Sequence, residues 1–459
     1  MRNEAAIRNP HSPNAPGPRL GSVPPSRVLL PLGLAVCLSL FGDLTLYAVL
    51  VTQLDVVGLS LGAVGIMLGV NRLVRIPGNP LAGVLFDRWG RRPLFLLGML
   101  VGVLSIVGSA LLRGFWPFLL TRLGWGVAWT LINVGGMAMV LDVSTRANRG
   151  RLTGIYNTWM LAGLALGPLV GGLLVDALGF RPALLMCAGT CALGLAIAAA
   201  SLPETAPLRK SQIANRKSQT RATHYGNRIT ETALRKPHYG LRTPLVSVAG
   251  LFMITQLAGE GVVLSTVSLL LQQRFGPSAV VSLGGLTLGV ASAGGLLLAL
   301  RSALAGGIGP LAGHLSDGTA GRWPVIAGSL VAGLAGFGML FYATSLPTIL
   351  WGIALGAISG GAAQAALAAQ VGDLAPPGQE GVVMGAYATA GDVGSMAGPF
   401  LAFALISVVD LRWVYMVCAL AFVAGLGLLW RLRAVRLQKD PKGGDRNRFP
   451  KPSGSETRC

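Results

Sequence analysis

Seven ionisable side chains lie inside long apolar stretches of this sequence, where a charge needs a partner or water. They are three carboxylates and four arginines: Asp43, Arg72, Arg75, Arg122, Glu260, Arg301 and Asp392. A charged group at the centre of a membrane helix costs roughly 3 kcal/mol on insertion scales, so facing all of them to lipid would cost on the order of 20 kcal/mol. The residues therefore predict either a structural ion-pair network or a polar path for protons and a ligand.

Two of these residues are placed to exchange a proton. Asp43 lies seven residues before the end of the apolar stretch 28–50, and Arg122 lies five residues after the start of the apolar stretch 117–140. Both of these ends are expected on the outer side of the membrane. Because these depths match, the two can pair, and a partly buried carboxylate next to an arginine changes its protonation when the pair moves. We predict Asp43 as the proton-coupling carboxylate with Arg122 as its partner. Glu260 and Asp392 are the rival carboxylates.

The stretches that hold these residues are long enough to cross a membrane. The chain has 459 residues, of which 52% are hydrophobic and only 12% are charged, whereas soluble domains carry roughly 25% charged residues. A membrane helix needs about 20 apolar residues. Twelve stretches meet this need, at 28–50, 61–84, 94–112, 117–140, 153–175, 181–201, 245–271, 285–312, 323–343, 346–370, 381–405 and 413–432. We expect an all-α membrane protein.

An internal repeat divides the spans into two sets of six. The segment Pro80–Asp87 recurs 230 residues later as Pro310–Asp317, and Gly163-x-x-x-Gly167-Pro168 recurs 231 residues later as Gly394-x-x-x-Gly398-Pro399. Such a repeat predicts two similar bundles related by an axis along the membrane normal. The predicted parts are an N-terminal tail, a first bundle, a basic linker, a second bundle and a C-terminal tail, at 1–27, 28–202, 203–244, 245–432 and 433–459.

The basic residues are distributed as in a membrane protein. The net charge is +20, yet 29 of the 37 Lys and Arg fall in tails and loops on one side, 4 on the other and 4 within spans. By the positive-inside rule, both termini and the linker are cytoplasmic. We expect a multi-pass protein of a bacterial inner membrane, surrounded by lipid and monomeric. Nucleic acid is not an expected partner, because no basic, aromatic-rich soluble module is present.

The loop after the second span carries a recognisable pattern. Gly83-x-x-x-Asp87-Arg88-x-Gly90-Arg91-Arg92 resembles the signature of the major facilitator superfamily. The resemblance implies twelve helices, alternating access and a cytoplasmic latch between the halves at these residues. The second copy has Asp317 but lacks the basic residue directly after it. Leu202-Pro-Glu204-Thr205 also resembles a family element.

Two further motifs narrow the resemblance. Arg122-x-x-x-Gly126-x-Ala128 resembles a family element of the fourth span. Gly163-x-x-x-Gly167-Pro168-x-x-Gly171-Gly172 matches a signature associated with the drug/proton antiporters of the superfamily. Its glycines form a stripe without side chains and its proline bends the helix, which predicts close helix packing and gating. The alternative is a generic packing face. The second copy is Gly394, Gly398 and Pro399.

The resemblance implies a central substrate cavity between the halves. Aromatic, sulfur-containing and polar residues of the spans are its candidates: Tyr47, Arg72, Arg75, Trp125, Trp129, Asn133, Tyr156, Trp159, Met160, Met253 and Arg301. The resemblance of the fifth-span motif to the antiporter signature implies proton-coupled efflux of hydrophobic compounds, and a large apolar and aromatic set of cavity residues would tolerate varied ligands. Four arginines against three carboxylates favour neutral or anionic substrates, so the alternatives are a proton symporter importing an organic anion or sugar, and a transport-inactive receptor or scaffold.

Several patterns for other chemistry are absent from the sequence. It has no G-x-x-x-x-G-K-[ST] phosphate loop, its four histidines have no metal-ligand spacing, and its five cysteines give no disulfide framework. We therefore expect neither an enzyme nor a resident metal or cofactor. The expected partners are a small-molecule substrate, protons and membrane lipid.

Overall fold

A computed structural model describes residues 24–145, 148–205, 239–276, 281–283, 286–318, 321–376 and 380–439. In this part of the chain, eleven helical segments are long and apolar enough to cross a membrane. Helix α3 (Leu61–Trp89) is not among these eleven segments, although its 29 residues are enough to cross a membrane. It contains Asn71, Arg72 and Arg75, which reduce its mean hydropathy. With α3, the described chain has the twelve expected spans, and the predicted all-α membrane fold is confirmed.

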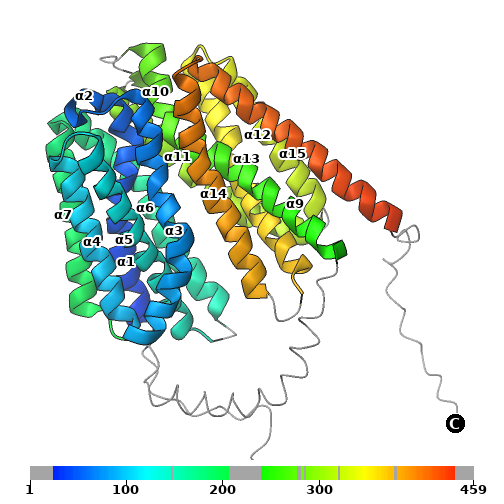
Figure 1. The fold of residues 1–459 in the computed structure, drawn as a ribbon, viewed down its shortest axis with the longest axis horizontal. Coiled ribbons are helices and arrows are strands. Elements are labelled where there is room, and N and C mark those ends of the chain that lie inside the picture. The colour runs from blue at the N-terminus through cyan, green and yellow to red at the C-terminus, as the bar shows by residue number, and fades with distance from the viewer. Residues whose placement is uncertain are drawn as a thin grey trace, which may run out of the picture.

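The spans form two bundles of six (Figure 1). The N-terminal bundle contains α3 and α1 (Pro25–Val49), η1 (Leu50–Gln53), α2 (Leu54–Val57), α4 (Arg91–Leu111), α5 (Phe115–Asp142), α6 (Arg149–Leu178) and α7 (Phe180–Ser201). The C-terminal bundle contains α9 (Tyr239–Gln256), η2 (Leu257–Val263), α10 (Leu264–Phe275), α11 (Val290–Asp317), α12 (Arg322–Phe341), α13 (Leu346–Leu374), α14 (Glu380–Ile406) and α15 (Leu411–Lys439).

The helix ends differ from the predicted spans by a few residues. Helix α1 begins at Pro25, where proline suits the first turn of a helix because its missing N–H would have no partner there. Helix α15 continues to Lys439, beyond the predicted end at 432. The expected tails and linker otherwise fall mostly on residues 1–23, 206–238 and 440–459, which lie outside the described residues.

One short element was not expected from the sequence. Strands β1 (Val281–Leu283) and β2 (Leu286–Leu288) form an antiparallel hairpin in which Leu283 pairs with Leu286. The two glycines between the strands in the sequence, at 284 and 285, lie outside the described residues. The hairpin takes up the start of the span predicted at 285–312, so α11 begins at Val290.

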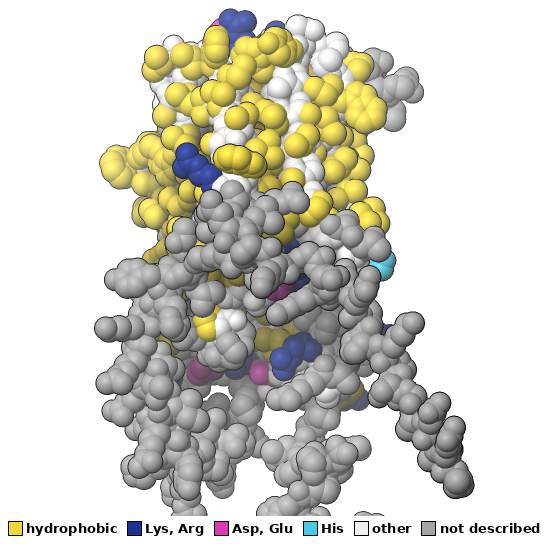
Figure 2. Space-filling view, turned by 90° about the vertical axis from the view of Figure 1, so that its right-hand side faces the viewer, with side chains coloured by type: hydrophobic (Ala, Val, Ile, Leu, Met, Phe, Trp, Pro, Cys, Tyr) yellow, Lys and Arg dark blue, Asp and Glu magenta, His cyan; other side chains and the backbone are white. Residues whose placement is uncertain are grey.

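The outer surface of the bundles is apolar. Large hydrophobic side chains are exposed on the C-terminal bundle, among them Val331, Trp351, Leu420 and Trp430. Figure 2 shows hydrophobic side chains over most of the described upper part of the molecule on that side. Exposure of this extent on helices indicates a surface that faces lipid.

The bundles are in contact from one end to the middle of their helices and are separated at the other end. We name the end that carries Asp87 and Arg91 the inner end, which the positive-inside rule assigns to the cytoplasm, and the opposite end the outer end. Toward the outer end, a Cβ atom on Gly295 of α11 would collide with the backbone of Pro168 in α6. Toward the inner end, added Cβ atoms on Gly154 and Gly385 would meet nothing in the described chain. The ribbons accordingly converge toward the outer end and separate toward the inner end (Figure 1).

Candidate functional site

Asp43 and Arg122 form a buried ion pair inside the N-terminal bundle. The Nη2 atom of Arg122 in α5 donates to Oδ1 of Asp43 in α1 at 2.6 Å, and its Nε donates to the carbonyl of Met67 in α3 at 2.9 Å. The side chains are only 1% and 9% exposed. Charges this deeply buried need direct partners, because removing an ion from water costs several kcal/mol. Three helices are therefore held together at one ion pair.

The surroundings of this pair are polar. Asn71 of α3 points Nδ2 toward Oδ1 of Asp43 at 3.5 Å, and the buried Oδ1 of Asn71 has no hydrogen-bond partner. Tyr47, a predicted cavity residue, is buried and donates its hydroxyl to the carbonyl of Leu68 at 2.8 Å. The unpaired oxygen of Asn71 is therefore a free hydrogen-bond acceptor beside the carboxylate of Asp43.

The other five ionisable residues link the two bundles. In η2, Oε1 of Glu260 accepts from Nη2 of Arg301 in α11 at 2.9 Å, and Oε2 lies 3.7 Å from Nη2 of Arg72 in α3. Nη2 of Arg75 lies 3.0 Å from Oδ1 of Asp392 in α14. We name these residues, Arg72, Arg75, Glu260, Arg301 and Asp392, the inter-bundle cluster. All seven ionisable residues singled out in the sequence thus have partners of opposite charge.

The inter-bundle cluster lies midway along its helices, where η2 departs from regular helical geometry. Residues Leu257–Val263 form a π-helix, a rare conformation that occurs frequently at functional sites. Gly259 leaves space for the guanidinium of Arg301, because a Cβ atom there would lie 3.1 Å from Nη2. Gly261 packs against Gly398 of α14, which belongs to the second copy of the Gly-x-x-x-Gly-Pro motif. The distorted segment thus presents Glu260 to both bundles.

The predicted latch residues form a charged cluster at the inner end. Nη1 of Arg91 donates to Asp87 at 2.9 Å, and its Nε donates to Asp142 of α5 at 3.1 Å. The backbone N–H groups of Arg91 and Arg92 donate to the carboxylate of Glu204 at 3.0 and 3.1 Å. An acidic group at a helix start is favourable there. Glu204 therefore ties the end of the first bundle to the start of α4.

The remaining latch residues differ from one another. Gly90 has a φ of 91°, a left-handed conformation that glycine adopts without strain, and it separates α3 from α4. Arg88 is exposed. Gly83 does not pack against another helix, because an added Cβ would meet nothing within 4 Å in the described chain. The reason is that the bundles are apart at this end.

The second latch keeps the same arrangement despite its altered sequence. Nε of Arg322 lies 2.5 Å from Asp373, and its Nη1 lies 3.4 Å from Asp317. Asp142 and Asp373 are 231 residues apart, the repeat offset, and this was the signal that could have identified both from the sequence. An arginine between two carboxylates therefore stands at the inner end of each bundle.

The two proline motifs each contact both bundles. Gly163, Gly167 and Gly171 pack against α1, whereas Gly172 packs against Ala291 of α11. In the second copy, Gly394 packs against Met253 and the carbonyl of Pro399 lies against Gly65 of α3. Glycines of both copies therefore lie directly against neighbouring helices.

The structure places several predicted cavity residues inside the N-terminal bundle instead. Trp125 is buried near Gly102 of α4, Tyr156 is buried against Gly136 of α5, and Trp159 packs on Gly33 of α1. Apolar residues occur on every side of their helices, so sequence periodicity could not distinguish a ring that faces a neighbouring helix from one that faces a cavity.

The other predicted cavity residues are more accessible. Trp129 is half-buried and stacks on Trp125 with ring centroids 6.4 Å apart. Asn133 and Met160 are half-buried, and Met253 is exposed.

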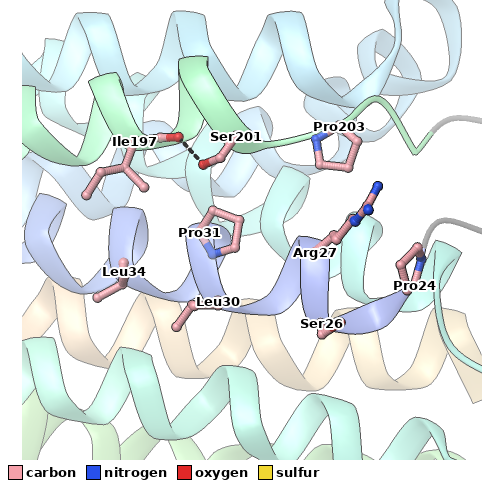
Figure 3. A pocket seen from close by; sticks show the side chains of 9 residues that line it. All are labelled: Pro24, Ser26, Arg27, Leu30, Pro31, Leu34, Ile197, Ser201 and Pro203. Carbon is pink, nitrogen blue, oxygen red and sulfur yellow. Dashed lines mark hydrogen bonds between the residues drawn. The ribbon is translucent and has the colours of Figure 1, made fainter.

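Two hollows are lined by residues outside the predicted set. One, of about 520 Å³, lies at the inner ends of α1 and α7 and is lined mainly by Leu30, Pro31, Leu34 and Ile197, with Arg27 at its edge (Figure 3). The other, of about 280 Å³, lies between α3 and α5 and is almost wholly apolar. Neither contains a member of the inter-bundle cluster.

Comparison with known proteins decides the family. The sequence model of the Major Facilitator Superfamily matches residues 32–302 and 287–457. The chain belongs to the Major Facilitator Superfamily. It is thus a multi-pass membrane transporter whose motifs resemble those of the drug/proton antiporter branch.

Two relatives differ in how much of the chain they match. Major facilitator superfamily domain-containing protein 10 of Mus musculus is 24% identical over 381 residues, covering 79% of this chain and 76% of that protein. Multidrug resistance protein MdtG of Dickeya zeae is 33% identical over 121 residues, covering 26% of this chain and 29% of that protein. The multidrug match therefore spans less than a third of that relative.

Solved structures share the fold. A bacterial homologue of the human lysosomal transporter Spinster, in an inward-facing and occupied conformation, superposes with a TM-score of 0.70 at 16% identity, covering 90% of this chain and 98% of that chain. The human organic anion transporter MFSD10 (TETRAN) superposes with a TM-score of 0.59 at 20% identity, covering 89% and 100%.

Proposed function

We propose that this major facilitator transporter exports hydrophobic compounds from the cytoplasm in exchange for protons. The observation that carries the proposal is the ion pair between Asp43 and Arg122, which is 2.6 Å long and almost fully buried. A carboxylate in such a position binds a proton when the arginine moves away and releases it when the pair re-forms. Its relatives named as multidrug and tetracycline resistance proteins support the direction of transport.

The substrate we propose is neutral or anionic. Between the bundles, three arginines face two carboxylates, which disfavours a lipophilic cation. A structural neighbour is named an organic anion transporter. The second candidate function is import of an organic anion or sugar together with protons. It would use the same charged residues, but the substrate would move in the same direction as the protons. A structural neighbour named a D-xylose-proton symporter has this fold as well.

The proposed setting is a bacterial inner membrane with both termini in the cytoplasm. In this orientation the bundles are separated on the cytoplasmic side, so the conformation is one that takes up an intracellular substrate (Figure 1). We propose a monomer, because each bundle is complete within the chain and the exposed surface is apolar as lipid requires. A transport-inactive receptor is the remaining alternative.

Transport into liposomes with an acidic lumen tests the proposal. Purified protein is reconstituted and supplied with neutral, anionic and cationic fluorescent compounds of similar hydrophobicity. An exchanger of protons for substrate accumulates its substrate inside, whereas a symporter drives it out. Liposomes without protein and liposomes without the pH gradient are the controls. Substrate expelled from the acidic lumen would support the symporter, and no gradient-driven movement of any compound would support the receptor.

A further inference from the structure

The inter-bundle cluster carries one uncompensated positive charge. Arg72, Arg75 and Arg301 contribute three positive charges, and Glu260 and Asp392 contribute two negative ones. These residues lie in the middle of membrane-spanning helices, where an unbalanced charge is costly. An anion at this position would restore neutrality.

The contacts locate the position that such an anion would take. The pair between Arg75 and Asp392 is close, at 3.0 Å, whereas Glu260 is shared unevenly between two arginines. One of its oxygens lies 2.9 Å from Arg301, but the other lies 3.7 Å from Arg72, which is longer than a hydrogen bond. Arg72 is thus the arginine with the weakest carboxylate contact in the cluster.

Glu260 is also the member that a ligand can reach. Its side chain is 32% exposed, compared with 6% for Arg301 and 13% for Arg72. The π-helical geometry of η2 and the flanking Gly259 bring the carboxylate to the boundary between the bundles. A second carboxylate approaching from the space between the bundles would therefore meet Glu260 first and compete with it for both arginines.

We propose that Arg72 and Arg301 bind the acid group of an amphipathic organic anion, and that Glu260 holds that position until the anion displaces it. The two arginines belong to different bundles, so one acid group bonded to both would draw the bundles together at the level of the substrate. This assignment rests on the proposed transport function and names its substrate class. Arg75 and Asp392 stay paired and set the spacing of the bundles beside the site.

Binding of matched probes to purified protein in detergent tests this site. The probes are pyrenebutanoate, its uncharged methyl ester and pyrenemethylamine, which share one ring system and differ in charge. We expect the carboxylate to bind about tenfold more tightly than the ester, as one charge-assisted hydrogen bond supplies. Arg301→Gln and Arg72→Gln should remove this preference and leave ester binding unchanged. Glu260→Gln should strengthen carboxylate binding severalfold, because the internal competitor is gone.

Two further variants keep the test decisive. Arg301→Lys retains the charge and should retain part of the preference, and the pair Arg301→Gln with Glu260→Gln avoids leaving a lone buried carboxylate if Arg301→Gln does not fold. Arg113→Gln is the matched control, since Arg113 is exposed at the outer end and donates to backbone carbonyls of Asp55 and Val56. It should change neither affinity.

Equal affinity of the native protein for the carboxylate and the ester would contradict the proposed anion site. An equal loss of affinity for both probes in Arg301→Gln would also contradict it. Either result leaves proton-driven export of neutral compounds intact. Conversely, a carboxylate preference that depends on Arg72 and Arg301 without gradient-driven transport would support the site and contradict the proposed function.

Discussion

Arg75 of α3 and Asp392 of α14 form an ion pair of 3.0 Å across the boundary between the two bundles. The side chains are 18% and 13% exposed, so the pair is shielded from most of the surrounding solvent. A transporter that alternates must rearrange contacts between its halves, and this pair is one that the present conformation makes.

Exchanging the two charged residues should separate the contribution of their ion pair to protein stability from the contribution of each side chain alone. Arg75→Gln or Asp392→Asn leaves one charge without its partner and should destabilise the protein by about 2 kcal/mol, less than the 3–5 kcal/mol of fully buried pairs. The double variant Arg75→Asp with Asp392→Arg should recover most of that loss in thermal unfolding. Asp410→Asn, which removes an exposed pair with Arg412, is the control and should cost under about 1 kcal/mol. A double variant no more stable than the single ones would contradict a direct pairing.

Gly295 should control closure of the outer end. The carbonyl of Pro168 lies against Gly295, and the carbonyl of Pro399 lies against Gly65, contacts related by the repeat offsets of 230 and 231. In Gly295→Leu, the side chain should force the backbones apart and expose the neighbouring Ala291, which packs on Gly172. An Ala291→Cys reporter, in a chain without its native cysteines, should then react with a soluble thiol reagent several times faster.

The matched control is Gly307→Leu in the same helix, because an added Cβ there meets nothing within 4 Å. It should leave reporter labelling unchanged. Equal labelling in Gly295→Leu and Gly307→Leu would show that the crossing at Gly295 does not hold the outer end closed.

The sequence allowed a contact to be predicted where two residues lie at the same depth in the membrane. It did not allow contacts to be predicted that depend on which helices are neighbours. Asp43 and Arg122 lie at matching depths, and the structure places them in contact. By contrast, nothing in a single sequence states that α3 faces η2 and α14, so the partners of Arg72 and Arg75 could not be derived. The surroundings of Trp125 and Tyr156 were not predicted for a related reason, because helices with apolar residues on every side give little periodic signal. The fold class followed from composition and length, which the bilayer constrains strongly.

Asp87 should affect the transport cycle more than substrate binding. It lies at the inner end, where its carboxylate accepts from Arg91, and its side chain is 69% exposed. An exposed pair contributes under about 1 kcal/mol to stability, so Asp87→Asn should fold normally. We expect unchanged affinity for a fluorescent substrate and a slower transport rate in liposomes. Asp410→Asn serves as the control for an exposed carboxylate at the opposite end. A loss of affinity with an unchanged rate would argue against a role in cycling.

The expected orientation can be checked by reporter fusions. Because 29 of 37 basic residues lie on one side of the predicted topology, the linker and the C-terminus should both be cytoplasmic. Fusions at Arg216 and after Cys459 to a reporter active only in the cytoplasm should both be active. A fusion placed after Arg113, between α4 and α5, should be inactive. Activity of that third fusion, or its absence in either of the others, would require a different topology.

Asp43 should be the group through which protons couple to substrate. It is held by Arg122 in a nearly sealed position, and Asn71 beside it has an unpaired oxygen that can take part when the pair separates. Proton release on substrate addition to detergent-solubilised protein in weak buffer measures the coupling. Asp43→Asn should abolish the release, whereas Glu260→Gln and Asp392→Asn should keep it. Because Asp43→Asn leaves Arg122 buried and unpaired, at a cost of about 3–5 kcal/mol, the double variant with Arg122→Gln is measured as well. Release that persists in both variants, but disappears in Glu260→Gln or Asp392→Asn, would move the coupling site to the inter-bundle cluster.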